Sequence, residues 1–354
     1  MALGTQMRSV DRIAKTDFHV ETHYHHSPQD TFMETPILVE NVLDSCTCEE
    51  ICDVLLSANL EVNVQRKQKE RSTDIYHVTL EQGVHVIMAS QHDDSCLIFE
   101  EGLLEREPSL QMISERLMGA RESLFTDEDW LAHFPTEVEP TSCVVIAGEG
   151  ATSTLHRDPL EWTGTSLCLE GTKIWRFVPP MPNVAAIDDA LASYRLNSIA
   201  WDENDLPISA GWQSNFNLFD KRSKDIPSAR SFDEMEPSEK WKEMEAIATD
   251  VLSLQPNVKV SQLWTAVQKP GDLLIIPAYW WHQTYALEPS VAVASQRCGT
   301  KRDAPRLVRH ILETSGLIHD TETVKGLLRD SYEDGSESPR EIINKLFTKL
   351  ASSR

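Results

Sequence analysis

Two extended segments, far apart in the chain, carry the residues that most restrict how it can fold. The first, residues 153–158, has a histidine and an aspartate two positions apart, His156 and Asp158. Side chains at positions i and i+2 of a strand point to the same side, so these two can face one point in space. The second, residues 271–282, is an apolar run that begins at a Pro-Gly turn and ends in His282. A fold that joins the three side chains must bring two distant strands together.

Two histidines and one carboxylate on one side of a metal leave the opposite coordination positions open, which is the ligand set of non-haem Fe(II) oxygenases. A lone His-x-Asp is a weak signal, because a polar strand end explains it equally well. Residues 167–180 strengthen this signal, since their alternating pattern of side chains predicts a strand pair around a Glu-Gly-Thr turn. Lys173 follows this turn. It can face the same cavity and pair with a bound carboxylate, or it can be an ordinary exposed lysine.

Three segments in this order, residues 153–159, 169–180 and 269–283, resemble the JmjC (jumonji C) family. The resemblance covers roughly residues 36 to 300. It implies a mainly β protein with helices (α+β), built on a double-stranded β-helix of the cupin or jelly-roll type. It also implies an oxygenase that uses Fe(II), 2-oxoglutarate and O₂. The spacing from His156 to Lys173, with a proline directly after Asp158, looks most like the branch of lysyl hydroxylases and arginine demethylases.

The resemblance assigns roles to single positions of this sequence. His156, Asp158 and His282 match the family's metal ligands, which makes them the catalytic residues. Lys173 matches the cation that holds the distal carboxylate of 2-oxoglutarate. Ser153, three positions before the first histidine, matches the hydroxyl that shares this carboxylate. These five residues form the expected active site.

Two further positions are farther from the family pattern. Ser166 falls where related enzymes often carry an asparagine near the cosubstrate, so we expect it to contact 2-oxoglutarate. Arg157 replaces the commoner aromatic or aliphatic residue, and it either lies outside the metal side of the strand or reaches toward substrate. The implied reaction hydroxylates a protein side chain such as lysine or arginine, with succinate and CO₂ as co-products. Where the carbon is an N-methyl group, hydroxylation leads to demethylation.

The composition narrows the classes of partner. Of the 354 residues, 40% are hydrophobic, which is enough to bury a core. The excess of 56 acidic over 33 basic residues gives a net charge of −23, which disfavours binding to a nucleic-acid backbone. The charge fits either a basic polypeptide substrate or solubility alone. Scattered cysteines, and the lack of a signal peptide or a long apolar run, predict an intracellular protein, cytoplasmic or nuclear, without membrane contact.

The sequence pattern divides the chain into four regions. The histidine-rich residues 1–33 predict a mobile N-terminal tail rather than a metal-binding tract. Residues 34–140 predict an N-terminal α/β elaboration, and residues 141–300 the cupin core, which holds a long insertion at 181–262. Residues 301–354 predict helices that either pack on the barrel or form a homodimer interface.

Several elements are predicted within these regions. A helix begins after Asp44 and places Cys48 and Cys52 on its buried side. Trp280 and Trp281 are expected to wall the metal site and keep it dry. The remaining periodic segments predict strands over residues 60–90, 143–148, 261–268 and 290–296, and helices over 95–130, 185–194, 233–254, 307–312, 324–328 and 342–350.

Three functions stay open from the sequence. The first is an oxygenase that acts on a protein side chain. The second is an oxygenase that acts on a small molecule or a nucleoside of tRNA or other RNA, although the sequence shows no RNA-binding module or basic patch. The third is a catalytically silent cupin that serves as a binding protein. The four retained residues, His156, Asp158, Lys173 and His282, weigh against the third, because a silent protein has no physical need of them.

Overall fold

The computed structural model describes most of the chain outside the insertion. The described residues are 6–9, 11–13, 22–23, 35–67, 73–89, 95–135, 139–158, 162–178, 212–214, 219, 263–278, 280–299, 308, 311 and 337–352. The helices predicted at 185–194, 233–254 and 324–328 lie outside the described residues. Of the helix predicted at 307–312, the structure describes Val308 and Ile311.

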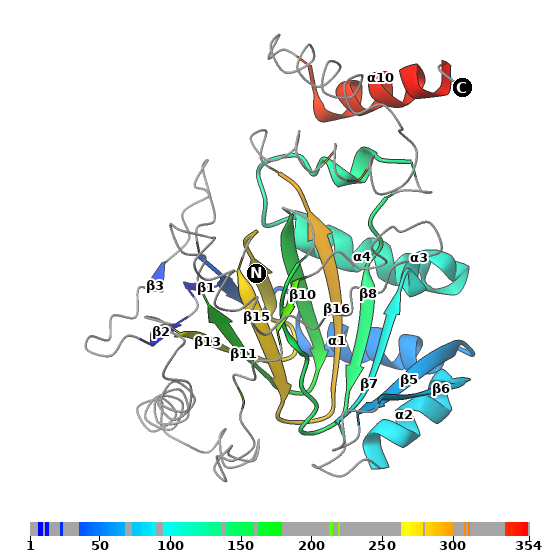
Figure 1. Ribbon diagram of the computed structural model, residues 1–354, viewed down its shortest axis with the longest axis vertical. Helices are drawn as coiled ribbons and strands as arrows, with labels where there is room; N and C mark the ends of the chain where they lie inside the picture. Colours follow the sequence, from blue (N-terminus) through cyan, green and yellow to red (C-terminus); the bar gives the residue numbers. More distant parts are fainter. Residues whose placement is uncertain are drawn as a thin grey trace.

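Two antiparallel sheets form the body of the molecule (Figure 1). In the described residues, the larger sheet runs β3 (Thr22–His23), β1 (Gln6–Ser9), β4 (Ile37–Glu40), β14 (Leu273–Ile276), β10 (Thr163–Glu170), β16 (Ser290–Arg297), β8 (Cys143–Ala147), β7 (Ser95–Glu101), β5 (Glu61–Lys67) and β6 (Thr73–Thr79). The smaller sheet runs β12 (Trp212–Ser214), β9 (Leu155–Arg157), β15 (Trp281–Ala286), β11 (Lys173–Val178), β13 (Leu263–Gln268) and β2 (Asp11–Ile13).

The chain winds between the two sheets. From β8 onward it visits the larger sheet, then β9 in the smaller, β10 in the larger and β11 in the smaller. It continues through β13 in the smaller sheet, β14 in the larger, β15 in the smaller and β16 in the larger. This alternation is the winding of a double-stranded β-helix, or jelly roll. The fold class predicted from the sequence is therefore confirmed.

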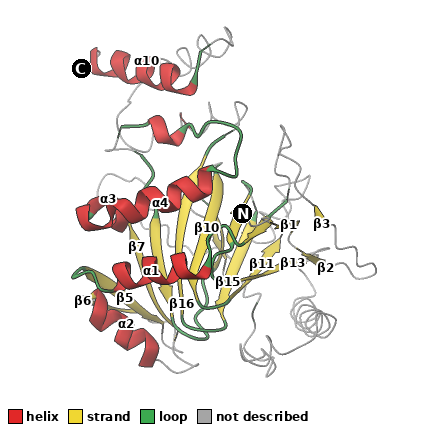
Figure 2. Cartoon of the chain, turned by 180° about the vertical axis from the view of Figure 1, so that it is seen from behind, coloured by secondary structure: helices red, strands yellow, loops and turns green. Residues whose placement is uncertain are grey.

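Helices cover the outer face of the larger sheet (Figure 2). They are α1 (Ser45–Leu56), α2 (Leu80–Ala89), α3 (Leu103–Arg106) and α4 (Gln111–Glu122), accompanied by the 3-10 helix η1 (Pro108–Leu110). Their apolar sides pack with the sheet in one buried cluster that includes Leu55, Ile87, Leu117, Val64, Ile98, Val144, Leu167, Leu273 and Val293. Because the helices close this face, the opposite face of the larger sheet is left for the space between the sheets.

The first helix forms as predicted. The Asp44 carboxylate accepts a hydrogen bond of 2.8 Å from the backbone N–H of Thr47, which satisfies one free donor of the first turn. Cys48 and Cys52 are buried, and burial raises their pKa values to about 11 and about 12. These thiols are therefore inert packing residues rather than ligands.

Two predicted elements are wrong. Within the strands predicted over residues 60–90, residues 80–89 form the helix α2 instead, because Leu80, Gly83 and Ile87 recur at helical spacing and are buried against the sheet. Residues 95–101 form the strand β7 and not a helix, with Cys96 and Ile98 buried under the helices. In both places, burial against distant parts of the chain decides the structure, and the local pattern misleads.

The ends of the chain also join the fold. The expected tail at residues 1–33 contributes β1, which pairs with β4 and β3, and β2, which pairs with β13. Near the other end, α10 (Pro339–Ser352) forms as predicted and starts with a capping box between Ser338 and Glu341. None of the described helices is long and apolar enough to cross a bilayer.

The apolar side of α10 is buried within the molecule. Ile342, Ile343 and Leu346 pack against Trp130 and against the residues that follow it, which form the 3-10 helix η2 (Leu131–His133). α10 therefore packs on the segment around η2 of the same chain, and the homodimer interface expected as the alternative stays a prediction.

Candidate metal centre and its cavity

Two neighbouring strands of the smaller sheet bring the predicted metal ligands together. His156 on β9 stands directly opposite His282 on β15, and their ring centroids are 4.2 Å apart. Asp158 follows β9, and its Oδ1 lies 3.8 Å from the His282 Nε2. One ligand atom from each residue lies within 4.8 Å of the others, and in the described part of the chain no other group of acidic, histidine or cysteine side chains meets this criterion.

Both imidazoles are held in the tautomer that a metal requires. The His156 Nδ1 donates to the Thr154 carbonyl at 2.8 Å, and the His282 Nδ1 donates to the Trp280 carbonyl at 3.1 Å. A carbonyl can only accept, so each ring carries its proton on Nδ1 and keeps a lone pair on Nε2. Burial, and then the nearby His156, lower the pKa of His282 to about 4. His282 is therefore neutral near pH 7, as ligation demands.

A glycine makes room for the third candidate ligand, Asp158. A Cβ placed on Gly164 would lie 2.6 Å from Oδ2 of Asp158, closer than any real contact of a Cβ. The Asp158 carboxylate thus packs against the backbone of β10 where Gly164 has no side chain. Sequence reasoning missed this residue, although a glycine inside the apolar strand pattern of residues 163–170 signals the close approach of another group.

The three residues stand at one side of a cavity of about 190 Å³ between the sheets. Its lining includes all six residues that the sequence singled out, namely Ser153, His156, Asp158, Ser166, Lys173 and His282. Much of the remaining wall is apolar and includes Leu97, Phe99, Val145, Ala147, Ala151, Trp175, Ile276, Ala286 and Ala294. Such a wall limits the water that can reach the centre.

The tryptophan in this wall is Trp175 rather than the two that were expected. Trp280 packs edge-on against Trp264, with centroids 5.5 Å apart, and Trp281 lies 5.9 Å from the Arg157 guanidinium. Neither Trp280 nor Trp281 is among the described residues that line the cavity, so that expectation is wrong. The buried Arg157 side chain lies with Trp281, outside the metal side of its strand, which decides between the two alternatives for this residue.

Lys173 is a buried cation on the cavity wall. It is 4% exposed, and its Nζ lies 5.5 Å from the centroid of Trp175. Burial lowers its pKa, whereas the Cys168 and Cys143 thiols raise it, and no carboxylate of the described residues has such an effect. A buried ammonium without a nearby carboxylate is costly, so an acid bound in the cavity would stabilise it.

Two serines line the cavity with this lysine. The Ser153 Oγ accepts from the backbone N–H of Thr284 at 2.9 Å, which leaves its own proton available to a ligand. Ser166 is buried on β10, where its carbonyl accepts a hydrogen bond of 2.7 Å from Gln268. Its position is fixed by the strand, and its side chain lines the cavity.

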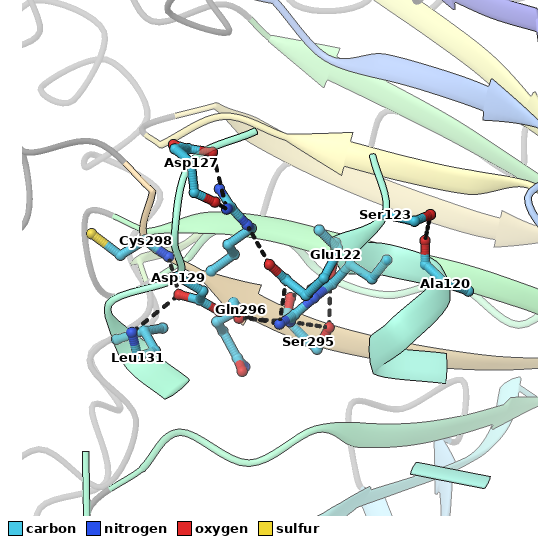
Figure 3. A network of polar contacts seen from close by, with 12 residues as sticks. Ala120, Glu122, Ser123, Asp127, Asp129, Leu131, Ser295, Gln296 and Cys298 are labelled. Carbon is cyan, nitrogen blue, oxygen red and sulfur yellow. Dashed lines mark hydrogen bonds and ion pairs between the residues drawn. The ribbon is translucent and has the colours of Figure 1, made fainter. Parts of the chain in front are cut away.

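A buried ionic network supports the cavity wall from behind (Figure 3). Arg121 on α4 donates to the Ser295 Oγ at 3.0 Å and to the Gln296 carbonyl at 2.9 Å, and it pairs with Asp129 at 3.1 Å. Ser295 in turn bonds the Thr165 hydroxyl at 2.7 Å. Burial raises the pKa of Asp129. The network fixes the ends of β16 and β10 that lie beside the metal centre.

Comparison with known proteins gives one family. Residues 59–295, more than half of the chain, match the family model described as "Cupin-like domain". No curated protein matches the sequence. Among solved structures, the X-ray structure of E. coli ycfD is similar, with 12% identity and a TM-score of 0.36. That alignment covers 80% of this chain and 56% of the ycfD chain, so this chain spans little more than half the length of that protein.

Proposed function

We propose, from the premise that this chain belongs to the cupin-like domain family, that it is an Fe(II)- and 2-oxoglutarate-dependent oxygenase of the JmjC type. The observation that carries the proposal is the cluster of His156, Asp158 and His282, whose ligand atoms lie within 4.8 Å of one another. This cluster borders a cavity that has a buried lysine in its wall. A metal-binding face and a cation for an acidic cosubstrate thus share one space.

The donor set fits Fe(II). Two imidazole nitrogens and one carboxylate bind from one side, and they leave room for two atoms of a chelating acid and for O₂. When bound, iron with 2-oxoglutarate and O₂ supplies the oxidation of a substrate C–H bond to an alcohol, with succinate and CO₂ as co-products. The protein fixes the ligands beforehand, because both Nδ1–H groups are held by carbonyls within their own strand segments.

The remaining side chains would bind and orient the cosubstrate. Lys173 would neutralise the distal carboxylate of 2-oxoglutarate, and the Ser153 and Ser166 hydroxyls would donate to it. Trp175 and the apolar wall would keep water away from the reacting centre. No side chain needs to act as a nucleophile in this scheme.

For the substrate, we propose a polypeptide side chain such as lysine or arginine. The sequence spacing from His156 to Lys173, which resembles the lysyl hydroxylase and arginine demethylase branch, supports it. The net charge of −23 also supports a basic partner. The product would be an alcohol, or a demethylated residue where the oxidised carbon is an N-methyl group. A small molecule or an RNA nucleoside is the alternative substrate, and a silent binding protein is the alternative function.

The test is succinate formation from 2-oxoglutarate by the purified protein with Fe(II) and ascorbate. We expect wild-type protein to form succinate slowly without its substrate, and the His156→Ala/His282→Ala double variant to form none. His85→Ala is the matched control, because His85 is exposed on α2, away from the cavity. Its activity should equal that of wild type. Equal succinate formation by the double variant and by wild type would refute the metal assignment.

If wild-type protein forms no succinate, a second measurement is needed to find the cause. Binding of Fe(II) and 2-oxoglutarate without oxygen, followed by the absorption of the ternary complex, separates two causes. Binding that depends on His156 and His282 would indicate an enzyme that turns over only with its substrate. Absence of binding would indicate a silent cupin and would contradict the proposal.

A further inference from the structure

The cavity opens toward a part of the larger sheet that lies beyond the barrel. Leu97, Phe99 and Glu101, all on β7, belong to its lining. The larger sheet continues from β7 to β5 and β6, well away from β11 and β13 of the smaller sheet (Figure 1). Phe99 is 47% exposed and Ile75 on β6 is 65% exposed. This extension of the sheet therefore offers an open surface that continues into the cavity.

The strand register shows which side chains share this surface. Gln65 on β5 stands opposite Ile75 on β6 and opposite Leu97 on β7, so all three point to the cavity side. Glu61 lies four positions before Gln65 and shares its side. We call the set of Glu61, Gln65, Ile75, Leu97, Phe99 and Glu101 the entry face.

The entry face combines an exposed aromatic ring with carboxylates. Phe99 and Glu101 are two positions apart on β7, and both are exposed. A ring face beside a carboxylate holds a cation through the ring quadrupole and an ion pair, and the ring also covers the aliphatic stem of lysine or arginine. Glu61 adds a second carboxylate, which lies 2.9 Å from His77.

Among the described residues, the lysine and arginine positions nearest this surface lie away from Glu101. Lys67 stands opposite Ser95, at the other end of β7 from Glu101. Arg106, which follows β7, lies 3.8 Å from Glu100. The acidic side chains of the entry face are Glu101 and Glu61, of which Glu61 is paired with His77. The charge complement of this surface is therefore a cation.

We propose that the entry face binds an extended, cationic segment of a polypeptide, with a lysine or arginine side chain between Phe99 and Glu101. This inference rests on the proposed function, since it gives that active site a route for a polypeptide substrate. Glu101, Cys143, Ala294 and Ser166 lie in one row across four strands. Three strand spacings, about 14 Å, thus separate Glu101 from Ser166, farther than one side chain reaches. The cation at Glu101 belongs to a residue that flanks the one oxidised.

The test is a binding measurement on the full chain, without catalysis. The probes are two fluorescein-labelled peptides of equal length, one of alternating lysine and serine and one of alternating glutamate and serine. Fluorescence anisotropy gives the Kd of each peptide at low and at physiological salt. We expect the lysine peptide to bind, and the Phe99→Ser/Glu101→Gln variant to bind it about fivefold more weakly or worse.

A matched variant separates the entry face from the overall negative charge. Met112→Ser/Glu49→Gln removes one exposed apolar side chain and one exposed carboxylate on the helix-covered side, so it changes composition in the same way. We expect its affinity for the lysine peptide to stay close to wild type. Equal losses in the two double variants would show that binding follows net charge alone and would overturn the inference. So would a Phe99→Ser/Glu101→Gln variant that binds as wild type does.

Charge reversal gives an independent result. Glu101→Lys should weaken binding of the lysine peptide and strengthen binding of the glutamate peptide, while melting temperatures show that each variant is folded. An unchanged preference in a folded Glu101→Lys variant would refute the assignment of the cation to this site. Succinate formation is measured separately without peptide, so a failure of the chemistry and a failure of the docking surface are distinguishable.

Discussion

The fit between Gly164 and Asp158 allows a sharp test of the metal centre. In Gly164→Ala, the new methyl group would lie 2.6 Å from Oδ2 of Asp158, whereas ordinary contacts begin at 3.4 Å. The carboxylate must therefore move by about 0.8 Å, the difference between the two distances. Ligand distances in metal sites tolerate only about 0.2 Å. We expect the affinity for Mn(II), measured by electron paramagnetic resonance as a stand-in for Fe(II), to fall about 10- to 100-fold.

The same substitution should leave the fold intact. The Asp158 carboxylate is the end of a side chain that can rotate away, and alanine suits a strand better than glycine does. Gly119→Ala is the matched control, because a Cβ at Gly119 on α4 would meet nothing within 4 Å. We expect both variants to melt near the wild-type temperature and only Gly164→Ala to lose metal. If Gly164→Ala binds Mn(II) within twofold of wild type, Asp158 does not ligate the metal from its position beside Gly164.

Three further predictions concern the surroundings of the centre. Lys173→Ala should weaken 2-oxoglutarate binding about tenfold or more in calorimetry, with Mn(II) affinity little changed, and an unchanged 2-oxoglutarate affinity would remove its assigned role. Arg121→Met leaves the Asp129 carboxylate buried without its partner and should lower the free energy of unfolding in urea by about 3–5 kcal/mol. Arg116→Met removes an exposed ion pair on the same helix and should lower it by less than about 1 kcal/mol. Similar losses in the two variants would contradict a stabilising role of the buried network. The pKa of His282, about 4 when folded, lies below its unfolded value, so the unfolded chain is protonated first as pH falls. Metal-free protein should therefore lose up to about 3 kcal/mol between about pH 6.5 and 4, and His282→Gln should lose less; an equal pH dependence in the variant would contradict the shift.

The three candidate ligands could be named from the sequence because three short segments, in order along the chain, resemble one family, whereas the His-x-Asp pattern alone is a weak signal. An extended backbone is enough to point the His156 and Asp158 side chains to the same side of a strand. The turn before Lys173 is predicted by the adjacent residues Glu170, Gly171 and Thr172 alone. The role of Gly164 could not be predicted with them. It depends on how closely a carboxylate from β9 approaches β10, which only the packed sheets determine. Trp175, by contrast, could have been placed in the wall, because it lies two positions after Lys173 on the same predicted strand.

The errors outside the site have a related cause. Residues 84–88 alternate in a way that fits a strand, yet burial of Gly83 against the Val64 and Ile98 side chains requires a helix that packs closely on the sheet. Residues 95–101 hold one short apolar run at positions 96–99, which fits a buried helix segment as well as a strand. They become one because β5 and β8 offer hydrogen bonds on both sides. Long-range pairing of this kind leaves little trace in a short window of sequence.

The register that places His156 opposite His282 bears on how the protein would acquire its metal during synthesis. The first two candidate ligands leave the ribosome long before the third, because the whole insertion at 181–262 and the strands β10, β11, β13 and β14 lie between them. A nascent chain with only His156 and Asp158 can bind a metal ion weakly at best. Capture must then wait until β15 pairs with β9, when geometry rather than raw ligand affinity discriminates among the available ions. Late assembly of this kind would protect the growing chain from tightly binding copper or zinc.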